Sequence, residues 1–375
     1  MMHNNSVTIF ARNTTDIVDF ECLDFDTMSV SELAVWLHHH GAAHLSAIER
    51  VELAERLTRR RFITRAGGLL GAAALAGCTQ SELEPAQVAG PKRTVQHVLG
   101  TTDVPEVPRR VITCDFYFTL PTAIKLQMPV VGAPFGATQA LPDWVAALAP
   151  ADVTDVGTNA EPNLERMAAL QPDLIIGFAF FLEPIYTEVT AIAPTVVLPH
   201  EMLNNGWKNG VRQLAEVFGQ QETVEQYFRD YDQRVQVLQQ AIGEEIAIKT
   251  VSLVRVLKDE LRIHTKLHFG GSVLAEAGLS RPSHHTNVDD EQPVIRLTLE
   301  QIEQIDADAM FVIVGGGGRN EGASQTFETL QQNPLWQQLQ AVRNGSVYPV
   351  GDHWLSGELH AANLILDDLQ SNLLG

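Results

Sequence analysis

Cysteine, basic charge and long apolar runs are all scarce in this sequence. Only three of the 375 residues are cysteines, Cys22, Cys78 and Cys114, and none sits in a CxxC pair, which excludes that kind of zinc site. A formal net charge of −20 argues against nucleic acid or an anionic membrane surface as the main partner. The hydrophobic fraction of 45% is ordinary, so the chain can bury a large globular core.

The most apolar stretch near the start is too short to cross a membrane. Residues 66–77 would form a helix of about 18 Å, whereas a bilayer core needs about 20 residues. A basic group that includes Arg59 and Arg60 precedes this stretch, and the segment resembles a twin-arginine export signal. Leu75–Cys78 resembles a lipoprotein box, in which Cys78 is lipidated and becomes the mature N-terminus. The alternative is a buried Ala/Gly-rich helix that follows a basic turn.

Residues 1–77 are therefore interpreted as a leader, although they are long for one. Translation could start at Met1 or at Met28. A cluster at His38–His40 with His44 could be a metal site, but it would be removed with the leader. Once the leader is removed and Cys78 carries lipid, Cys114 has no partner for a disulfide. Residues 78–93 are polar and are expected to form a flexible tether.

Beyond the tether, strand-like and helical stretches alternate twice, with a long helical break between. The first half, residues 94–205, has strand patterns at 110–114, 130–132, 173–177 and 195–198 and helical patterns at 120–126, 141–148, 164–170 and 184–191. The second half, residues 246–375, has strand patterns at 250–256, 261–267, 310–314 and 347–350 and helical patterns at 271–277, 299–305, 334–341 and 359–374. Such alternation predicts parallel sheets.

The break between the halves, residues 206–245, contains two predicted helices, of which the first spans residues 207–218 and ends at Gly219. Residues 221–242 carry apolar side chains at helical spacing and would span about 33 Å, enough to bridge two lobes. The predicted fold class is therefore α/β, with two Rossmann-like lobes joined by one long helix.

Four ordered motifs resemble a known family. They are Val107–Ile112, Glu161–Gly177, Leu299–Val314 and Asn333–Tyr348. Over residues 94–374 the chain is similar to the substrate-binding lipoproteins of iron–siderophore ABC importers. The resemblance implies the class III periplasmic binding protein fold, a shallow cleft between the lobes, and no enzymatic activity. It also implies delivery of a ferric siderophore to an ABC permease with its ATPase, by a monomer anchored outside the cytoplasmic membrane.

Ligand-binding residues are expected after the carboxyl ends of the strands, where α/β sheets hold ligands. Aromatic residues gather there, and rigid aromatic rings contact a bulky chelate at low entropic cost. Arg255 lies near the end of a buried strand and could donate to chelate oxygens, as an arginine at the matching place does in the family. Trp354 matches a pocket tryptophan of the family. The predicted ligand-binding residues are Phe116, Tyr117, Phe178, Phe180, Arg255 and Trp354.

Each of these residues also has an ordinary structural explanation. The phenylalanines could simply close the core, and Arg255 could be a solvated residue at a strand end. The resemblance assigns Glu165 and Glu300 to permease docking, one on each lobe. Both begin helices, where a carboxylate is stabilised by the helix dipole in any case.

The expected ligand is a ferric siderophore of the hydroxamate or citrate–hydroxamate type. The siderophore itself would hold the iron, so we expect no protein metal ligand and no cofactor. Haem or a corrinoid is the alternative, and haem would need an axial residue such as Tyr117, His268 or His353.

Other possible sites are weaker. His264 and His268 are four positions apart, and the surrounding alternation predicts a strand, in which such positions lie about 13 Å apart, too far to share a metal. His284 and His285 could touch a metal from a polar loop. Residues 315–318 are four glycines without the Lys-Ser/Thr ending of a phosphate loop, and are expected to form a flexible loop.

Overall fold

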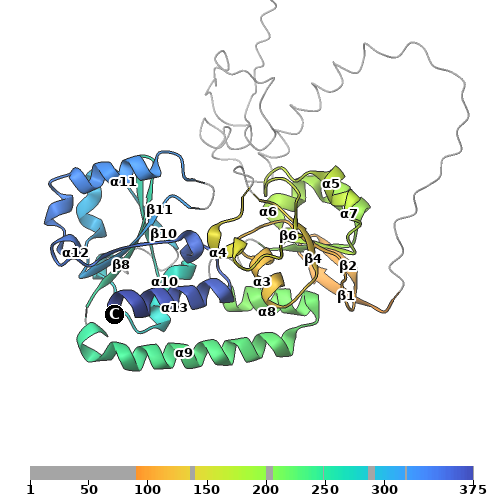
Figure 1. Cartoon of the computed structure of the whole chain (residues 1–375), viewed down its shortest axis with the longest axis horizontal. Helices are drawn as coiled ribbons and strands as arrows, with labels where there is room; N and C mark the ends of the chain where they lie inside the picture. The colour runs from red at the N-terminus through yellow and green to blue at the C-terminus, as the bar shows by residue number, and fades with distance from the viewer. Residues whose placement is uncertain are drawn as a thin grey trace, which may run out of the picture. The chain divides into compact units, whose positions relative to one another are not determined.

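The described part of this computed structural model begins at residue 90. It covers residues 90–135, 140–199, 206–247, 249–285, 292–316 and 319–374, all within the compact unit Leu83–Gly375 (Figure 1). Arg59, Arg60, Cys78 and the histidines at 38–44 lie outside the described residues. Within the described residues, no helix combines the length and apolar character that a membrane crossing requires.

The first lobe is built on a parallel sheet with the strand order β5-β4-β3-β6-β7. Its strands are β3 (Val111–Thr113), β4 (Val130–Ala133), β5 (Thr154–Asp155), β6 (Leu174–Phe178) and β7 (Thr195–Leu198). Its helices are α3 (Thr119–Lys125), α4 (Asp143–Ala146), α5 (Leu164–Ala169), α6 (Ala179–Leu182) and α7 (Tyr186–Ile192). An antiparallel hairpin, β1 (Lys92–His97) with β2 (Gly100–Pro105), lies beside β7.

Both faces of this sheet are covered, which explains why β6 is apolar at every position. Leu174 and Ile176 join one hydrophobic cluster, while Ile175 joins another on the opposite face with Met167 of α5 and Val189 of α7. A strand that is buried on both faces needs apolar residues at successive positions rather than at alternate ones.

The second lobe contains a mixed sheet with the order β10-β9-β8-β11-β12. Its strands are β8 (Val251–Leu257), β9 (Glu260–His264), β10 (Val294–Leu297), β11 (Ala309–Val314) and β12 (Val347–Val350). Strands β8, β11 and β12 are parallel, whereas β9 and β10 are antiparallel to their neighbours. Its α-helices are α10 (Phe269–Glu276), α11 (Ala323–Gln332), α12 (Gln340–Arg343) and α13 (Leu359–Leu373). The 3-10 helices that matter below are η3 (Ser283–His285), η4 (Leu299–Ile305), η5 (Trp336–Gln338) and η6 (Asp352–Leu355).

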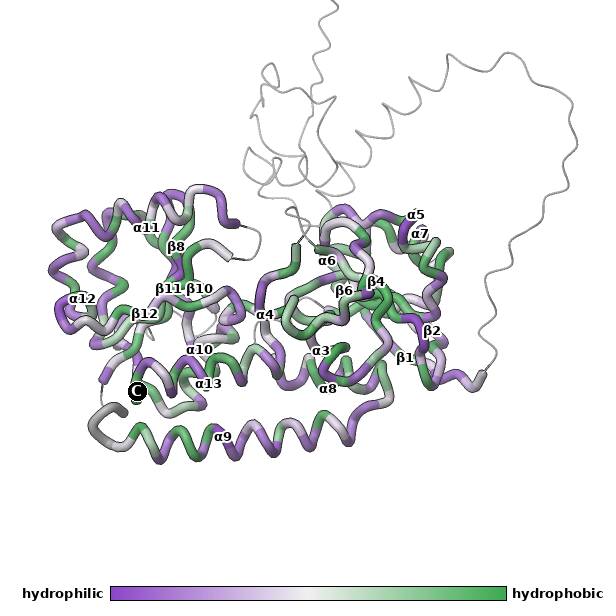
Figure 2. The backbone as a smooth tube through the Cα atoms, viewed as in Figure 1, coloured by the Kyte–Doolittle hydropathy of each residue, from purple (hydrophilic) through white to green (hydrophobic). Residues whose placement is uncertain are grey.

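Two helices connect the lobes, α8 (Trp207–Phe218) and α9 (Gln221–Ala247). Gly219 ends α8 with a φ of 69°, in the left-handed region that glycine tolerates best. Helix α9 runs below both sheets and packs against α8 and α13 (Figure 1). Its apolar residues at helical spacing, including Phe228 and Tyr231, are buried. Figure 2 shows the resulting alternation of hydrophobic and hydrophilic colour along α9. One hydrophobic cluster therefore contains residues of both lobes and of the connecting helices.

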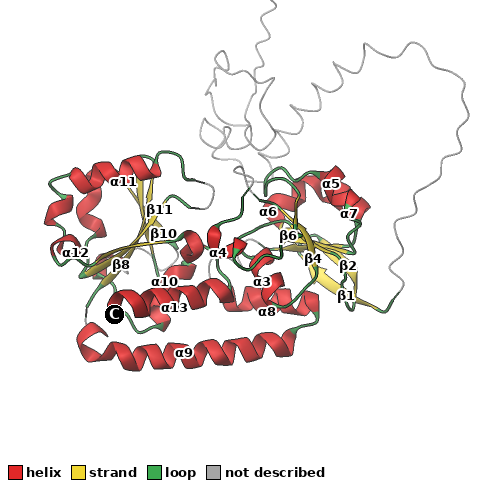
Figure 3. Cartoon of the chain, viewed as in Figure 1, coloured by secondary structure: helices red, strands yellow, loops and turns green. Residues whose placement is uncertain are grey.

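The predicted α/β architecture with a long connecting helix is confirmed, but several local predictions were wrong (Figure 3). The predicted strand 261–267 ends at His264, because the chain turns before α10. The predicted helix 334–341 is broken at Leu339, whose ψ of 138° separates η5 from α12. The β1–β2 hairpin and strand β10 were not predicted.

Candidate functional site

Residues that follow strands of both sheets meet between the two lobes. Asp352, at the start of η6 after β12, accepts hydrogen bonds from two residues of the first lobe. Tyr117 Oη donates to Asp352 Oδ2 at 2.7 Å, and Trp144 Nε1 donates to Asp352 Oδ1 at 2.9 Å. Ser356 Oγ also donates to the backbone carbonyl of Tyr117. We call Tyr117, Trp144, Arg255 and Asp352 the lobe junction.

Asp115 fixes the start of the segment that carries Tyr117. Its buried carboxylate accepts the backbone N–H groups of Tyr117 at 3.1 Å and Phe118 at 2.6 Å, directly after β3. Burial raises the pKa of Asp115, and the hydrogen bonds from these N–H groups oppose that rise. The rings of Phe116 and Tyr117 lie 4.4 Å apart, so the neighbouring ring also holds the tyrosine in place.

Arg255 lies near the carboxyl end of β8 and is nearly buried, with 8% of its surface exposed. Its Nε donates to the carbonyl of Gly315 at 2.6 Å, and its Nη2 donates to the carbonyl of Gly316. Both glycines have positive φ angles, 73° and 79°, and a Cβ atom at Gly316 would lie only 2.7 Å from the Cβ of Asp352. Glycine is therefore required where this loop approaches the arginine.

The guanidinium of Arg255 stays cationic at neutral pH. Burial and the neighbouring Arg262 lower its pKa to about 10, while Tyr117 and Asp352 oppose that shift. Its third nitrogen, Nη1, makes no hydrogen bond within the described residues. The lobe junction thus offers a cationic donor, a phenol and an indole N–H, together with one carboxylate. Such donors suit a ligand with several oxygen acceptors.

The predicted aromatic residues differ in exposure. Phe180 of α6 is 71% exposed at the carboxyl end of β6, whereas Phe116 and Phe178 are buried in the core. Trp354 is fully buried, stacks on Phe311 with ring centroids 4.9 Å apart, and donates its Nε1–H to Asp368 at 2.7 Å. The ligand contacts of these residues stay predictions.

Trp144 was missed from the sequence. It comes from α4, which Figure 1 places between the two sheets. No local pattern distinguishes it from an ordinary helical tryptophan. The contact with Asp352 joins positions 208 residues apart in the chain, so only the folded structure reveals it.

The prediction that His264 and His268 lie far apart was wrong. Their ring centroids are 3.9 Å apart, at nearly perpendicular orientation. Because β9 ends at His264, the chain turns and brings His268 back beside it; the backbone N–H of His268 donates to the carbonyl of Thr265 at 3.0 Å.

The remaining candidate residues form no metal or nucleophilic site in the described part of the chain. His284 and His285 both approach the carbonyl of Gln304, at 2.9 and 2.8 Å. Cys114 is a buried free thiol, and burial raises its pKa further from neutrality, which opposes thiolate formation. No group of three or more His, Cys, Asp or Glu side chains in this part could hold a metal ion.

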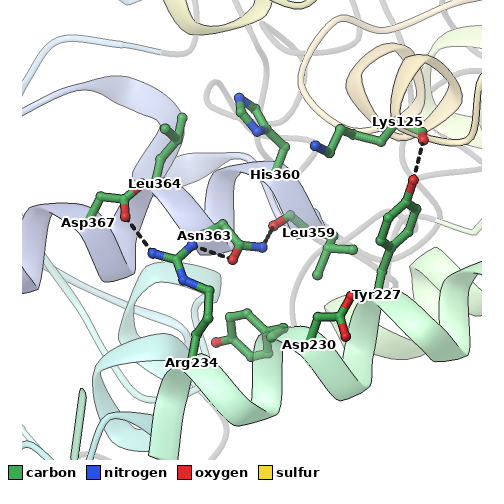
Figure 4. A pocket seen from close by; sticks show the side chains of 10 residues that line it. Lys125, Tyr227, Asp230, Arg234, Leu359, His360, Asn363, Leu364 and Asp367 are labelled. Atoms are coloured by element: carbon green, nitrogen blue, oxygen red, sulfur yellow. Dashed lines mark hydrogen bonds and ion pairs between the residues drawn. The ribbon is translucent and has the colours of Figure 1, made fainter. Parts of the chain in front are cut away.

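A pocket of about 340 Å³ lies elsewhere, between α9, α13 and the end of α3 (Figure 4). Its arginine, Arg234, is already paired with Asn363 at 2.6 Å and Asp367 at 2.5 Å. Tyr227 donates to the carbonyl of Lys125 at 3.1 Å across the same space. These contacts join the connecting helix α9 to both lobes. The residues that line the pocket do not include any residue of the lobe junction.

Glu165 and Glu300 are both exposed. Glu165 lies in the first turn of α5, which Asn163 caps by accepting the N–H of Arg166 at 2.9 Å. Glu300 lies in the first turn of η4, which begins with a capping box between Thr298 and Gln301. The hydroxyl of Thr298 and the backbone N–H of Glu300 lower the pKa of the Glu300 carboxyl group. The permease-docking role of both glutamates stays a prediction.

Two α/β lobes joined by a long helix, with donor groups from both lobes at their junction, define a helix-linked two-lobe binding protein. The family model described as "Periplasmic binding protein" matches residues 127–353, and the chain belongs to this family. The fold is the class III form, and members of the family are substrate-binding transport proteins rather than enzymes.

Several named proteins are similar to this chain. It is 31% identical over 322 residues to the "Probable siderophore-binding lipoprotein YfiY" of Bacillus subtilis, covering 82% of this chain and 96% of the relative. It is 30% identical over 273 residues to the achromobactin-binding periplasmic protein of Dickeya dadantii, covering 70% and 86%. The crystal structure of Staphylococcus aureus SirA complexed with staphyloferrin B matches with a TM-score of 0.65 and 26% identity, covering 75% and 98%.

Proposed function

We propose that this chain is the extracytoplasmic substrate-binding protein of an ABC importer and captures a ferric siderophore at the lobe junction. The observation that carries this proposal is the arrangement around Arg255. At the end of β8, the buried guanidinium of Arg255 donates to two loop carbonyls. Tyr117 and Trp144 of the other lobe donate to Asp352, which belongs to the same junction. The names of the relatives support a ferric chelate as the cargo.

The proposed ligand is a chelate of the hydroxamate or citrate–hydroxamate type. Its oxygens would accept from Arg255 Nη1 and from the phenol and indole donors once these leave Asp352. Phe180 would contact the apolar parts of the chelate from the rim of the first lobe, because its ring is largely exposed there. Relatives named for binding Fe(3+)-citrate and Fe(3+) dicitrate favour the citrate side of this proposal.

Delivery to a permease is the second part of the proposal. Glu165 and Glu300 project from the first turns of α5 and η4, one on each lobe, and are exposed. We propose that each pairs with a basic side chain of the permease. Membrane tethering through Cys78 after twin-arginine export would hold the protein at the outer face of the cytoplasmic membrane, beside that permease.

A fluorescence titration tests the proposal. The purified protein is titrated with ferric citrate, a ferric trihydroxamate and a ferric catecholate, with haem and cobalamin alongside. Trp144 would report binding, because its indole N–H lies in the junction. Sub-micromolar quenching by one class of ferric chelate is the expected result. Binding of haem or cobalamin alone would keep the fold and replace the ligand.

A further inference from the structure

Buried nitrogen atoms without hydrogen-bond partners gather beside Arg255 in the second lobe. Both ring nitrogens of His264, Nδ1 of His268, Nε of Arg262, and Nε and Nη2 of Arg281 have no partner. His264 is only 2% exposed and Arg262 only 8%. We call Arg262, His264, His268 and Arg281 the histidine–arginine cluster. A buried donor without a partner destabilises the folded state, and native proteins rarely leave several such donors together.

The register of the sheet explains how these residues come together. Arg262 of β9 lies directly opposite Arg255 of β8, and His264 follows two positions later on the same face. The turn after β9 brings His268 against His264. Arg281 reaches in from the loop after α10 and donates Nη1 to the backbone carbonyl of His264 at 2.5 Å. The cluster is therefore continuous with the lobe junction through Arg255.

The chemistry of the cluster suits an anion and not a metal cation. Three guanidinium groups, on Arg255, Arg262 and Arg281, surround the two imidazoles and would repel a cation. Glu260, which accepts from Arg262 Nη2 at 2.8 Å, is a carboxylate already paired with this group. Two or more oxygens on one planar group would match the unpartnered nitrogens of Arg281 and of the imidazoles.

We propose that the histidine–arginine cluster is an anion subsite that takes a carboxylate group. The carboxylate could be a pendant arm of the ferric chelate at the lobe junction, an assignment that rests on the proposed function, or a free carboxylate such as citrate. The subsite would select for chelates in which one carboxylate is not coordinated to iron. The lobe junction by itself would not distinguish these chelates from others.

Binding of a carboxylate beside the two histidines should be accompanied by proton uptake. Burial comes first among the causes that lower their pKa values, and the surrounding guanidinium groups add to it, so that the pKa of His268 falls to about 3. Both imidazoles are then neutral in the unliganded protein. A bound carboxylate stabilises the imidazolium form and raises these pKa values, so affinity increases as pH falls. His285 of η3 also faces Arg281 and contributes to the local charge.

Calorimetric titrations with three probes test the subsite: iron-free citrate, ferric citrate and a ferric trihydroxamate without carboxylates. Arg281→Gln and the double variant His264→Gln/His268→Gln are compared with the wild type. His284→Gln is the matched control, because His284 is exposed and contacts the carbonyl of Gln304 and the ring of His285 rather than a residue of the cluster. We expect binding of the carboxylate probes to weaken tenfold or more in the cluster variants. Trihydroxamate affinity and the control should stay at the wild-type value.

The pH dependence of binding is measured on the wild type, so this test does not depend on whether the variants fold. Between pH 5.5 and 8 the affinity for citrate should fall as pH rises, with net proton uptake measured in buffers of different ionisation enthalpy. Part of this pH dependence comes from titration of citrate itself. The double variant should keep that part and lose the remainder. Equal citrate affinity and equal slopes in all variants would overturn the subsite.

The probes separate this inference from the proposed function. If the cluster variants bind ferric citrate with the same affinity as the wild type, the subsite is overturned and the siderophore function stays intact. Citrate binding that depends on the cluster, without binding of any ferric chelate, would support the subsite with a free anion and overturn the siderophore function. Failure of citrate and of every chelate to bind would overturn both.

Discussion

Replacing Arg255 by glutamine should weaken binding of the ferric chelate by about 10- to 150-fold. Two of the three guanidinium nitrogens are held by Gly315 and Gly316, so Nη1 is the atom left for the ligand. One hydrogen bond to a charged group contributes about 1.5–3 kcal/mol, which corresponds to this range of affinity. Because the guanidinium is nearly buried, solvent screens the interaction only weakly.

The same replacement should also lower the free energy of unfolding. Glutamine cannot reach both loop carbonyls, and each buried carbonyl left without a donor costs about 1–3 kcal/mol, less where water can enter. Arg255→Lys keeps the charge but loses the two-pronged contact, and should fall between wild type and glutamine. Arg296→Gln is the matched control, since Arg296 lies in the same sheet opposite Arg262 but its side chain is 68% exposed.

Tryptophan fluorescence titration and urea unfolding measure the two effects on the same samples. A variant that unfolds normally and binds the chelate as tightly as wild type would remove Arg255 from the binding site. A loss of affinity that appears equally in Arg296→Gln would mean that overall positive charge, and not the geometry at Gly315 and Gly316, attracts the ligand.

Three further predictions follow from the structure. Asp352→Asn should tighten binding of an anionic chelate several-fold in the same titration, because it removes a like charge worth on the order of 1 kcal/mol; weaker binding would contradict this. Burial raises the pKa of Glu358 to about 7, so stability should fall as pH rises from about 4.5 to 7, by at most about 3 kcal/mol, and level off above; urea unfolding of Glu358→Gln should lack this slope. Combined Glu165→Ala and Glu300→Ala should preserve chelate binding in vitro and abolish uptake by cells, and normal uptake would refute their docking role.

Local patterns predicted most of the regular structure. The run 195–198 was predicted as a strand and forms β7 with the same limits, and the helix 207–218 ends at Gly219 as predicted. The errors occurred where tertiary contacts override a local pattern. Residues 261–267 alternate in polarity, yet the strand ends at His264 because the chain must turn to begin α10. The hairpin β1–β2 is half exposed and shows little hydrophobic periodicity, so it was missed.

The candidate site was predicted only in part. Tyr117 and Arg255 were named because they follow or end strands, and both lie at the lobe junction. Trp354 was named by family resemblance, and its indole N–H is bonded to Asp368 inside the core. Trp144, Arg262 and Arg281 were not named, and His264 and His268 were predicted to lie far apart, because the environment of these residues depends on the tertiary fold.

The sequence by itself determined the two α/β halves, the connecting helix and the family, because apolar periodicity and short ordered motifs are local properties of the chain. Tertiary structure alone decided which side chains meet. Tyr117 and Asp352 are 235 positions apart, and they share a hydrogen bond only because α8, α9 and α13 pack the two sheets into one hydrophobic cluster. Burial, orphaned donors and shifted pKa values arise from such packing, so no local pattern encodes them.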